Sequence, residues 1–559
     1  MQDYDVVVLG SGGAGLTAAL KAHDEGARVI VFEKADKVGG TTAWSGGMIW
    51  IPNNHHMAAL GIPDSRDEAL AYLSSLSHDL IDPELAAAFV DTGPEMVRWL
   101  EANTPVRFRV VEGFPDYHPE HPHGKPGGGR SLECPLFSYH ELGAWRDRVT
   151  VGHHYGKAPV VMAESPLGSA VPRPVPPEEI ARRTAEDLRG CGQALVGRLL
   201  KGCLDRDIEI ATETRAVALC VEEGGVGGVT LEGPSGRFEV RARGGVVLAT
   251  GGFEWDPDLV RSFLRGPMTS PVSIPTNTGD GLRMVMRIGA ALGNMREAWW
   301  MPAVEIPGDR GDGRPHQHLF AAERARPRSI MINRRGRRFT NEAANYNAFG
   351  AAFHEQDVAR FEYANLPCWF VFDQRYLDTY GFIGGLPGQP APNWVFCAPT
   401  LAQLAATLGV PADSLERTVE RWNRHCAEGS DPDFGRGSSA HDTWWGDPAR
   451  KGTPQATLGP LDTPPFHAVE VRSGALGTKG GPRTDQSGRV LHVDGHPIEG
   501  LYAAGNVMAS VMGMTYGGAG GTIAPGMVFG YLAGHDAAAR ARSSACDANC
   551  GDGVREGRR

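Results

Sequence analysis

Residues 4–15 read Tyr4-Asp5-Val6-Val7-Val8-Leu9-Gly10-Ser11-Gly12-Gly13-Ala14-Gly15, and this stretch decides the fold class. Its first half is an apolar, β-branched run that is typical of a buried strand. Its second half has the spacing Gly-x-Gly-x-x-Gly, directly before a segment that is predicted to be helical. Gly10 allows the tight turn, Gly12 lets a phosphate approach the backbone, and Gly15 allows close helix packing. A second apolar run at 28–32 follows, so the sequence predicts a Rossmann-like β-turn-α-β unit.

Glu33 lies at the end of the second predicted strand, 23 positions after Gly10. A carboxylate at this place accepts a hydrogen bond from a ribose hydroxyl, and the N-terminus of the helix attracts phosphates through its dipole. Gly13, Ala14 and Lys34 are neighbours of these elements and belong to the same predicted site. A glycine-rich turn without a ligand is the alternative, but the complete context favours a dinucleotide site.

Further glycine-rich segments along the chain indicate which dinucleotide to expect. The residues expected to contact it are Gly40, Thr41, Thr42, Ser45, Gly46 and Gly47, then Ala249, Thr250 and Gly251, then Asp280 and Gly281, and finally Gly505, Asn506, Gly521, Thr522 and Ile523. Together these segments resemble the flavoproteins of the fumarate reductase/succinate dehydrogenase superfamily, and the likeness spans nearly the whole chain. The resemblance implies that FAD is the cofactor and that an inserted cap domain covers its isoalloxazine.

The fold class implied is α/β, with a Rossmann-like FAD-binding domain of the glutathione reductase type and an inserted α+β cap or catalytic domain. Tryptophans concentrate towards the middle of the chain. We therefore expect the FAD-binding domain at 1–275 and 452–541 and the cap at 276–451. Residues 207–250 alternate β-type runs with glycine-rich turns, which predicts a small β-meander. Residues 542–559 are polar and without periodicity, so we expect a disordered tail.

Composition excludes several classes of protein. The chain has 559 residues and a formal net charge of −11, and its basic residues form no long run, so a nucleic-acid partner is not expected. Its nine cysteines are scattered and odd in number, which is typical of a reducing compartment. A strand begins almost at the N-terminus, and no apolar stretch reaches about 20 residues. We expect a cytoplasmic protein without a transmembrane segment; its oligomeric state and any peripheral membrane attachment stay open.

The predicted substrate site departs from that of enzymes that reduce dicarboxylates. Superfamily members acting on fumarate-like substrates resemble one another in carrying Arg and His around the flavin, because carboxylates demand charge-assisted donors. Where such enzymes have an Arg before the last helix, this chain has the segment 514–520, which contains no basic residue. Where they have a His before Met-Gly-Gly, it has the segment 475–481, in which Lys479 precedes two glycines. A neutral substrate is therefore favoured.

The segments 41–54, 337–346 and 510–531 resemble those of the 3-ketosteroid Δ1-dehydrogenases, enzymes that use FAD to desaturate a ring beside a ketone. Gly517 and Ala519 stand where these enzymes usually have prolines, so the loop around them is reshaped. Carried over one position at a time, the resemblance implies four catalytic residues: Tyr516, Gly520, Tyr346 and, by a looser match, Tyr117.

The chemistry explains why tyrosines serve in such a site. Removing a hydrogen alpha to a ketone builds enolate charge on the oxygen, where the Tyr516 hydroxyl and the Gly520 N–H would donate hydrogen bonds. Tyr346, assisted by Tyr117, would take the alpha proton as general base, and hydride would pass to the flavin. An ordinary tyrosine pKa near about 10 is too high for a base at neutral pH, so this hypothesis requires a lowered pKa at Tyr346. No metal is needed.

We therefore expect an FAD-dependent dehydrogenase that introduces a C=C bond alpha,beta to a ring ketone of a small apolar, steroid-like or related cyclic substrate. An external acceptor, a quinone or a dye, would receive the electrons. The alternatives are an ene-reductase or fumarate-reductase-like enzyme acting on a small enone or enoate, and a flavoprotein electron-transfer subunit. Each tyrosine also has a plainer interpretation as a packed aromatic. His118, His121, His123, His153 and His154 are expected to be loop histidines, not metal ligands.

Overall fold

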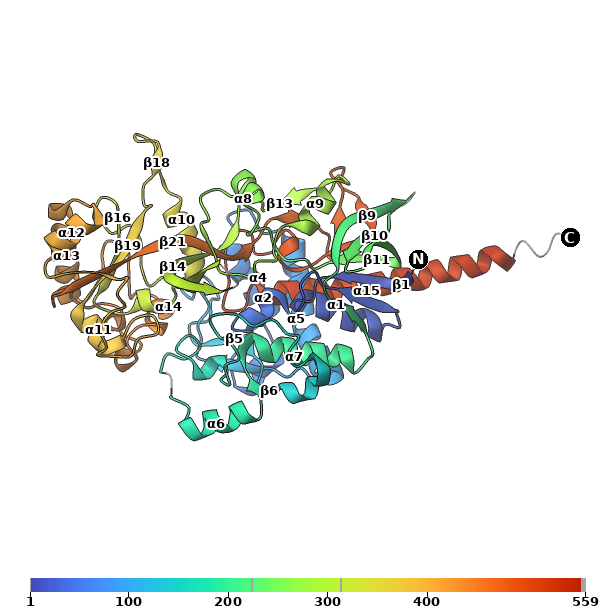
Figure 1. Cartoon of the computed structure of the whole chain (residues 1–559), viewed down its shortest axis with the longest axis horizontal. Coiled ribbons are helices and arrows are strands. Elements are labelled where there is room, and N and C mark those ends of the chain that lie inside the picture. The colour runs from blue at the N-terminus through green and yellow to red at the C-terminus, as the bar shows by residue number, and fades with distance from the viewer. Residues whose placement is uncertain (1, 172, 223–224, 312–313, 554–559) are drawn as a thin grey trace.

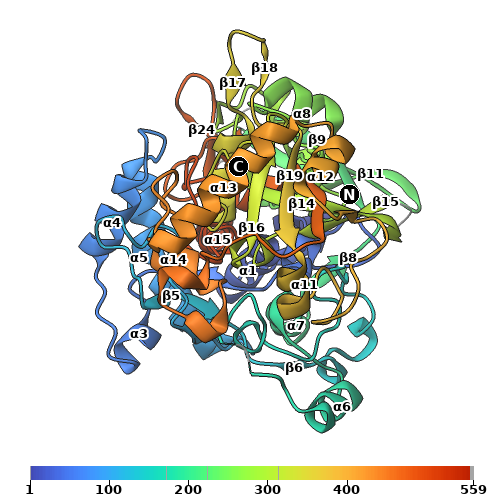
Figure 2. The same ribbon diagram turned by 90° about the vertical axis from the view of Figure 1, so that its left-hand side faces the viewer.

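The computed structural model describes residues 2–171, 173–222, 225–311 and 314–553, without the side chains of 2, 311 and 544–553. Figure 1 shows two lobes: one contains the N-terminal strand and the first helix, and the other contains the middle of the chain. Figure 2 looks onto the second lobe, where α12, α13 and α14 lie in front of its sheet. The cavity described below is lined by residues of both lobes.

The first lobe is built on a parallel sheet that begins with the stretch at 4–15. β1 (Gln2–Leu9) pairs in parallel with β2 (Val29–Phe32) on one side and β11 (Gly236–Leu248) on the other. The sheet order is β23-β24-β11-β1-β2-β8, with β8 at Glu209–Ala211, β23 at Arg489–Leu491 and β24 at Pro497–Ala503. This confirms the predicted α/β class, since the crossover from β1 to β2 runs through α1 (Gly13–Asp24).

Two helices pack against each other with their backbones almost in contact. α1 touches α15 (Ile523–Gly553), and a Cβ at Gly530 or Gly534 would lie 2.3 or 2.4 Å from the backbone carbonyl oxygens of Ala14 and Ala18. Only glycine permits such an approach. The close packing brings the first turns of both helices to the same cavity, which Gly13 and Ile523 line.

The predicted meander is confirmed. β9 (Arg215–Glu222), β10 (Gly225–Gly233) and β11 pair in antiparallel order and extend from the parallel sheet. Between β2 and the meander lie short strands and helices at α2 (Gly40–Trp44), β3 (Ile49–Trp50), α3 (His55–Ala59), α4 (Arg66–Ser75), α5 (Pro83–Asn103), β4 (Arg109–Glu112), β5 (Gly128–Glu133), β6 (Phe137–Ser138), α6 (Pro177–Ala185), β7 (Leu188–Arg189) and α7 (Cys191–Leu204).

The second lobe is an α+β unit around the sheet β15-β14-β21-β19-β16, which has its own apolar core. Its strands are β14 (Ala298–Gly311), β15 (Arg314–Leu319), β16 (Ser329–Asn333), β19 (Cys368–Asp373), β20 (Phe396–Ala398) and β21 (Phe466–Thr478), with β12 (Ser270–Pro271) at one end of β21. Its helices are α10 (Phe349–Phe353), α11 (Gln374–Tyr380), α12 (Leu401–Leu408), α13 (Ala412–Glu428) and α14 (Ala440–Trp444).

The boundaries between the lobes differ from those expected at 276–451. β21 lies beyond 451 in sequence but pairs with β14 and β19 of the cap sheet. α9 (Asp280–Met286) lies inside the expected cap range but packs on β9 of the first lobe. Strand pairing joins residues that are far apart in the chain, so composition alone did not locate the positions where the chain passes from one lobe to the other.

The C-terminus also differs from the expected disordered tail at 542–559. α15 continues to Gly553 without interruption, and 554–559 lie outside the described residues. The segment before this end is rich in alanine, the strongest helix former, which explains the continuation. Among the described residues, no helix combines the length and the apolar character needed to cross a bilayer.

Candidate active site

A long cavity is lined by residues of the first lobe at one end and by tyrosines and apolar side chains at the other. All but three of the residues expected to contact the cofactor line it. They are Gly10, Gly12, Gly13, Ala14, Glu33, Lys34, Gly40, Thr41, Thr42, Ser45, Gly46, Gly47, Ala249, Thr250, Gly251, Asp280, Gly505, Asn506, Thr522 and Ile523.

The nucleotide end of the cavity has the donors and the space that a dinucleotide needs. α1 begins after Gly12, which has no side chain to cap the helix, and the Gly13 N–H donates to the Thr42 hydroxyl at 3.0 Å. Gly12, Gly13 and Thr42 all line the cavity at this helix N-terminus. The Glu33 carboxylate is fixed by the Ser11 hydroxyl at 2.6 Å and by the Ala35 N–H at 2.9 Å. The Thr250 hydroxyl on the cavity wall is buried without a hydrogen-bond partner among the described residues. These features fit the pyrophosphate and ribose of FAD.

Lys34 and Asp280 belong to one ion-pair network beside this end. The Lys34 ammonium lies 2.9 Å from the Asp280 carboxylate and donates to the Thr278 hydroxyl at 2.8 Å. Arg215 donates twice to the same carboxylate, and the pKa of Asp280 is lowered because hydrogen bonds and charge from Arg215 and Lys34 outweigh its burial. Sequence reasoning missed Arg215, because it lies on β9, outside the glycine-rich segments.

Three expected cofactor residues do not line the cavity. A Cβ at Gly15 would lie 2.0 Å from the Gly10 carbonyl oxygen, so Gly15 has the predicted packing role at the turn. A Cβ at Gly281 would lie 2.3 Å from the Thr250 hydroxyl, and one at Gly521 would lie 3.0 Å from the Tyr516 ring. These glycines make room for groups that do line the cavity.

Gly10→Ala should weaken cofactor retention. Gly10 has φ of +105°, and a Cβ there would lie 2.3 Å from the Ala249 carbonyl oxygen. Strain of about 1–3 kcal/mol at such a position corresponds to roughly 5- to 150-fold weaker FAD binding. The ratio of flavin to protein absorbance after gel filtration measures this. Gly127→Ala is the matched control, because no atom lies within 4 Å of its Cβ position; equal flavin content in both variants would contradict the prediction.

The three predicted tyrosines meet at the other end of the cavity. The hydroxyls of Tyr117 and Tyr346 are hydrogen-bonded at 2.8 Å, although 229 residues separate them. The ring centroids of Tyr117, Tyr346 and Tyr516 are 5.0–5.5 Å apart in edge-to-face contacts. Tyr346 begins a 3-10 turn capped by the Asn345 side chain, which fixes its backbone. All three line the cavity with Gly520.

The lowered pKa required at Tyr346 is not found. Burial raises the pKa of Tyr346 well above the ordinary value, and the neighbouring Tyr117 and Tyr516 raise it further. Burial also raises the pKa of Tyr117. The expectation was wrong because the three phenols exclude water from one another, and burial in an apolar environment disfavours the phenolate. Tyr346 is therefore a neutral phenol near pH 7 in the described structure.

Tyr516 has a different environment. Its hydroxyl accepts a hydrogen bond from the Thr522 hydroxyl at 2.7 Å, which leaves its own proton available for an acceptor. Burial raises its pKa, but the Thr522 hydroxyl, Tyr346 and the backbone amides of Thr522 and Gly520 oppose that rise. Gly520 has φ of +101°, and a Cβ there would lie 2.6 Å from the Ile49 backbone. The two expected oxyanion donors, Tyr516 and Gly520, thus lie side by side on a tightly packed turn.

Lys479 supports this turn from behind, and its role was missed by sequence reasoning. Its side chain is fully buried, and its ammonium donates to the Thr515 carbonyl at 2.6 Å and lies 4.1 Å from the centroid of Trp299. Trp299 in turn contacts the Tyr516 ring at 4.8 Å. Burial lowers the pKa of Lys479 to about 7. The sequence showed only that Lys479 replaces a histidine, since its contacts come from distant segments.

Much of the remaining lining is apolar, although Tyr155 and His154 also line the cavity. Phe114, Leu167, Trp445, Leu319 and Leu476 line it. No arginine lies among the described residues that line this cavity. Trp299 packs behind Tyr516, and Trp300 packs in a separate apolar cluster.

Comparison with known proteins agrees with this geometry. The model of the family described as FAD binding domain matches residues 5–523. The chain belongs to the FAD binding domain family. FAD is therefore the cofactor of this flavoprotein, and the expected fold class is confirmed. The expected resemblance to the 3-ketosteroid Δ1-dehydrogenases is also confirmed by individual relatives.

Two curated relatives cover almost the whole flavoprotein. It is 45% identical over 545 residues to the 4-oxocyclohexanecarboxylate 2-dehydrogenase of Sinomonas cyclohexanicum, covering 96% of this chain and 93% of that one. It is 42% identical over 566 residues to the 3-oxosteroid 1-dehydrogenase of Mycobacterium tuberculosis (strain ATCC 25618 / H37Rv), covering 95% and 98%. A solved 3-ketosteroid Δ1-dehydrogenase from Sterolibacterium denitrificans, in complex with 1,4-androstadiene-3,17-dione, matches with a TM-score of 0.87 and 34% identity over 96% of this chain and 100% of that one.

Proposed function

We propose that this flavoprotein is a dehydrogenase that introduces a C=C bond alpha,beta to the carbonyl of an apolar cyclic ketone. The observation that carries the proposal is the cluster of Tyr117, Tyr346 and Tyr516 beside Gly520, in the cavity that the expected dinucleotide residues also line. The cluster offers hydrogen-bond donors for a ketone oxygen and a tyrosine oxygen that can accept a proton. It contains no cationic side chain. The named relatives support a cyclic ketone as the substrate class.

Each residue has a distinct task in this proposal. FAD, when bound between α1 and the tyrosines, supplies the acceptor for the hydride from the beta carbon. Tyr516 and the Gly520 N–H donate to the ketone oxygen, where negative charge develops. Tyr346, as its phenolate, takes the alpha proton and becomes a neutral phenol, and the hydrogen bond from the Tyr117 hydroxyl stabilises the phenolate before this transfer. Since burial raises the pKa of Tyr346, only a small fraction of it is phenolate at neutral pH, so its own proton must leave to solvent before the alpha proton is taken. Polarisation of the carbonyl by Tyr516 and Gly520 makes the alpha proton more acidic.

The side chains that line the cavity favour a substrate with an apolar ring system over one that carries a carboxylate. Phe114, Leu167 and Trp445 present carbon surface beside the tyrosines. A carboxylate on the ring would require a charge-assisted donor near it, and the only lysine or arginine among the described lining residues, Lys34, is engaged with Asp280 at the nucleotide end. We therefore place a steroid-like ketone ahead of 4-oxocyclohexanecarboxylate as the substrate.

The electrons then leave to an external acceptor, a quinone or a dye. Among the described residues, none of the clusters of potential metal ligands contains a cysteine. The side chains that the structure describes thus offer no iron–sulfur ligand set to carry the electrons onward.

The direct test is anaerobic reduction of the purified holoprotein. Androst-4-ene-3,17-dione is expected to bleach the flavin absorbance in single turnover, with the 1,4-diene as product. 4-Oxocyclohexanecarboxylate at the same concentration is expected to bleach it at least roughly tenfold more slowly, because its carboxylate is desolvated without a partner. Equal or faster bleaching by the carboxylate would reverse the substrate order. If no ketone bleaches the flavin while enones reoxidise the chemically reduced protein, the enzyme is a reductase and the proposal fails.

A further inference from the structure

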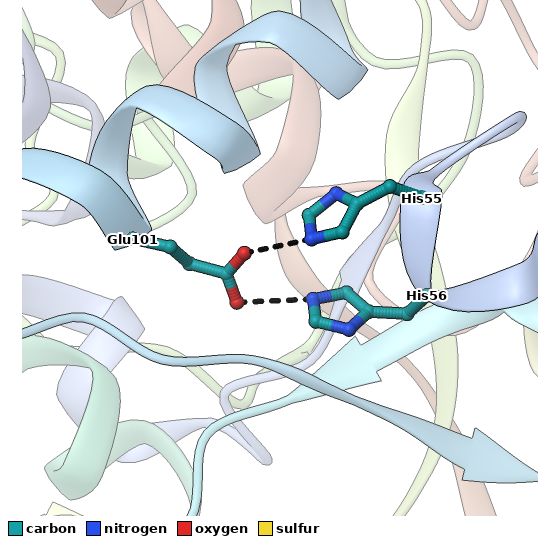
Figure 3. A group of neighbouring side chains, drawn as sticks. All are labelled: His55, His56 and Glu101. Atoms are coloured by element: carbon teal, nitrogen blue, oxygen red, sulfur yellow. Dashed lines mark hydrogen bonds and ion pairs between the residues drawn. The ribbon is translucent and has the colours of Figure 1, made fainter. Parts of the chain in front are cut away.

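A second convergent group lies outside the cavity, at His55, His56 and Glu101. Figure 3 shows both imidazole rings extending from the same short helix towards one carboxylate. The Nε2 atom of His55 lies 3.0 Å from one oxygen of Glu101, and the Nε2 atom of His56 lies 3.0 Å from the other. None of the three lines the FAD cavity, so the proposed reaction gives them no task.

The two rings converge in spite of their positions in the chain. Consecutive residues on a helix diverge by about 100°, yet the centroids of these rings are 4.0 Å apart. The backbone before them is fixed by Asn54, a buried residue whose side-chain amide donates to the carbonyls of Ile51 and Gly129. The same side chain accepts from the Met57 N–H and caps α3. Both rings are thus set in place by the fold.

Glu101 is oriented from its other side. It lies near the end of α5, its side chain is only 16% exposed, and one of its oxygens also accepts from the Phe108 N–H at 2.9 Å. Hydrogen bonds of this kind orient the carboxylates that bind metal ions, so that their lone pairs point towards the ion. The Nδ1 atom of His55 is buried without a partner among the described residues, so no bond there ties the ring to another role.

Three other groups of possible ligands in the described part of the chain are less suited to bind a cation, because their side chains have other partners or are exposed. In the group at 118–121, both rings contact further polar side chains. In the group at 425–433, both carboxylates pair with arginines. The group at 492–496 contains two exposed residues of one turn. Only the group at His55 and His56 combines a backbone-anchored carboxylate with imidazoles whose Nε2 atoms have no other described partner.

We propose that the Nε2 atoms of His55 and His56 and the carboxylate of Glu101 bind one zinc-type divalent cation, with water in the fourth position. Their ligand atoms all lie within 4.8 Å of one another, and a tetrahedral zinc with bonds of about 2.0–2.2 Å requires ligand atoms roughly 3.3–3.6 Å apart. Two imidazoles and one carboxylate form a donor set that zinc accepts. The ion would join α3 to α5 and stabilise this part of the first lobe.

The test uses the FAD-loaded full chain, treated with a chelator and dialysed against zinc chloride. We expect one zinc per bound flavin by elemental analysis after equilibrium dialysis, and a higher melting temperature with zinc than without it. Glu101→Gln and His56→Ala should each lower zinc affinity at least tenfold and abolish the shift in melting temperature. Glu101→Gln keeps an amide oxygen for the Phe108 N–H, so it tests the ligand without removing the structural bond. His140→Ala, an exposed histidine outside every group, is the matched control.

The outcomes separate this site from the alternatives. Wild-type protein that binds no zinc, or variants that bind it as wild type does, would overturn the proposal. Loss of zinc in His118→Ala and retention in Glu101→Gln would place the ion at the group 118–121 and equally overturn it. Flavin content and turnover of Glu101→Gln should equal those of wild type, so failure here leaves the proposed dehydrogenation untouched.

Discussion

Tyr346→Phe is expected to keep FAD and to lose turnover by roughly 10³- to 10⁴-fold, the upper part of the range for removing a general base. Phenylalanine keeps the ring contacts with Tyr117 and Tyr516, but no oxygen remains at this place to receive the alpha proton. Stopped-flow measurement of flavin reduction under anaerobic conditions gives the rate of this step, and the flavin spectrum confirms that the cofactor is retained.

The pH profile of the same rate tests the role more specifically. Because burial raises the pKa of Tyr346 above its ordinary value of 10.0, the phenolate fraction increases with pH throughout the neutral and alkaline range. If proton removal limits the rate, flavin reduction in wild type should accelerate from pH 7 to about 9, by up to tenfold per pH unit, without a plateau. Tyr346→Phe should lose this slope, whereas a residue that only packs would leave it unchanged.

Two further variants serve as controls for the assignment of Tyr346 as the base. Tyr376→Phe removes another buried hydroxyl, which donates to the Glu323 carbonyl in the cap and lies outside the cavity, and it should reduce flavin at the wild-type rate. Tyr117→Phe should retain measurable turnover, because Tyr117 acts through Tyr346. If Tyr117→Phe were inactive and Tyr346→Phe active, the base would be Tyr117 and the roles would be exchanged.

Tyr516→Phe is expected to slow flavin reduction by about 10²- to 10³-fold, the scale for losing one oxyanion donor. The loss is smaller than at position 346 because the Gly520 N–H remains beside the ketone oxygen. The Thr522 hydroxyl loses its acceptor but stays at the cavity wall, so FAD binding should be nearly unaffected.

The pH profile distinguishes the two tyrosines. Tyr516→Phe should lower the rate at every pH and keep the wild-type slope, since Tyr346 still receives the proton. A slope lost in Tyr516→Phe and kept in Tyr346→Phe would make Tyr516 the base. An unchanged rate in Tyr516→Phe would remove this residue from the mechanism.

Local sequence was sufficient for the elements whose geometry is short-range. The run at 4–15 predicted β1, its turn and α1, because strand burial and glycine spacing act within one unit. The alternation at 207–250 predicted the meander for the same reason. The boundaries near 276 and 451 were not predictable, since the pairing of β21 with β14 depends on residues more than 150 positions away.

The sequence by itself determined the α/β class and the position of the dinucleotide turn, and through resemblance it predicted catalytic roles for the four residues 117, 346, 516 and 520. The tertiary structure alone decided that three phenols share one water-poor pocket, and this is why the pKa of Tyr346 is raised and not lowered. It also decided that Lys479 supports the turn before Tyr516 and that His55, His56 and Glu101 converge. The physical reason is that desolvation and charge depend on which distant segments pack around a group, whereas strand and turn formation depend on its neighbours in the chain.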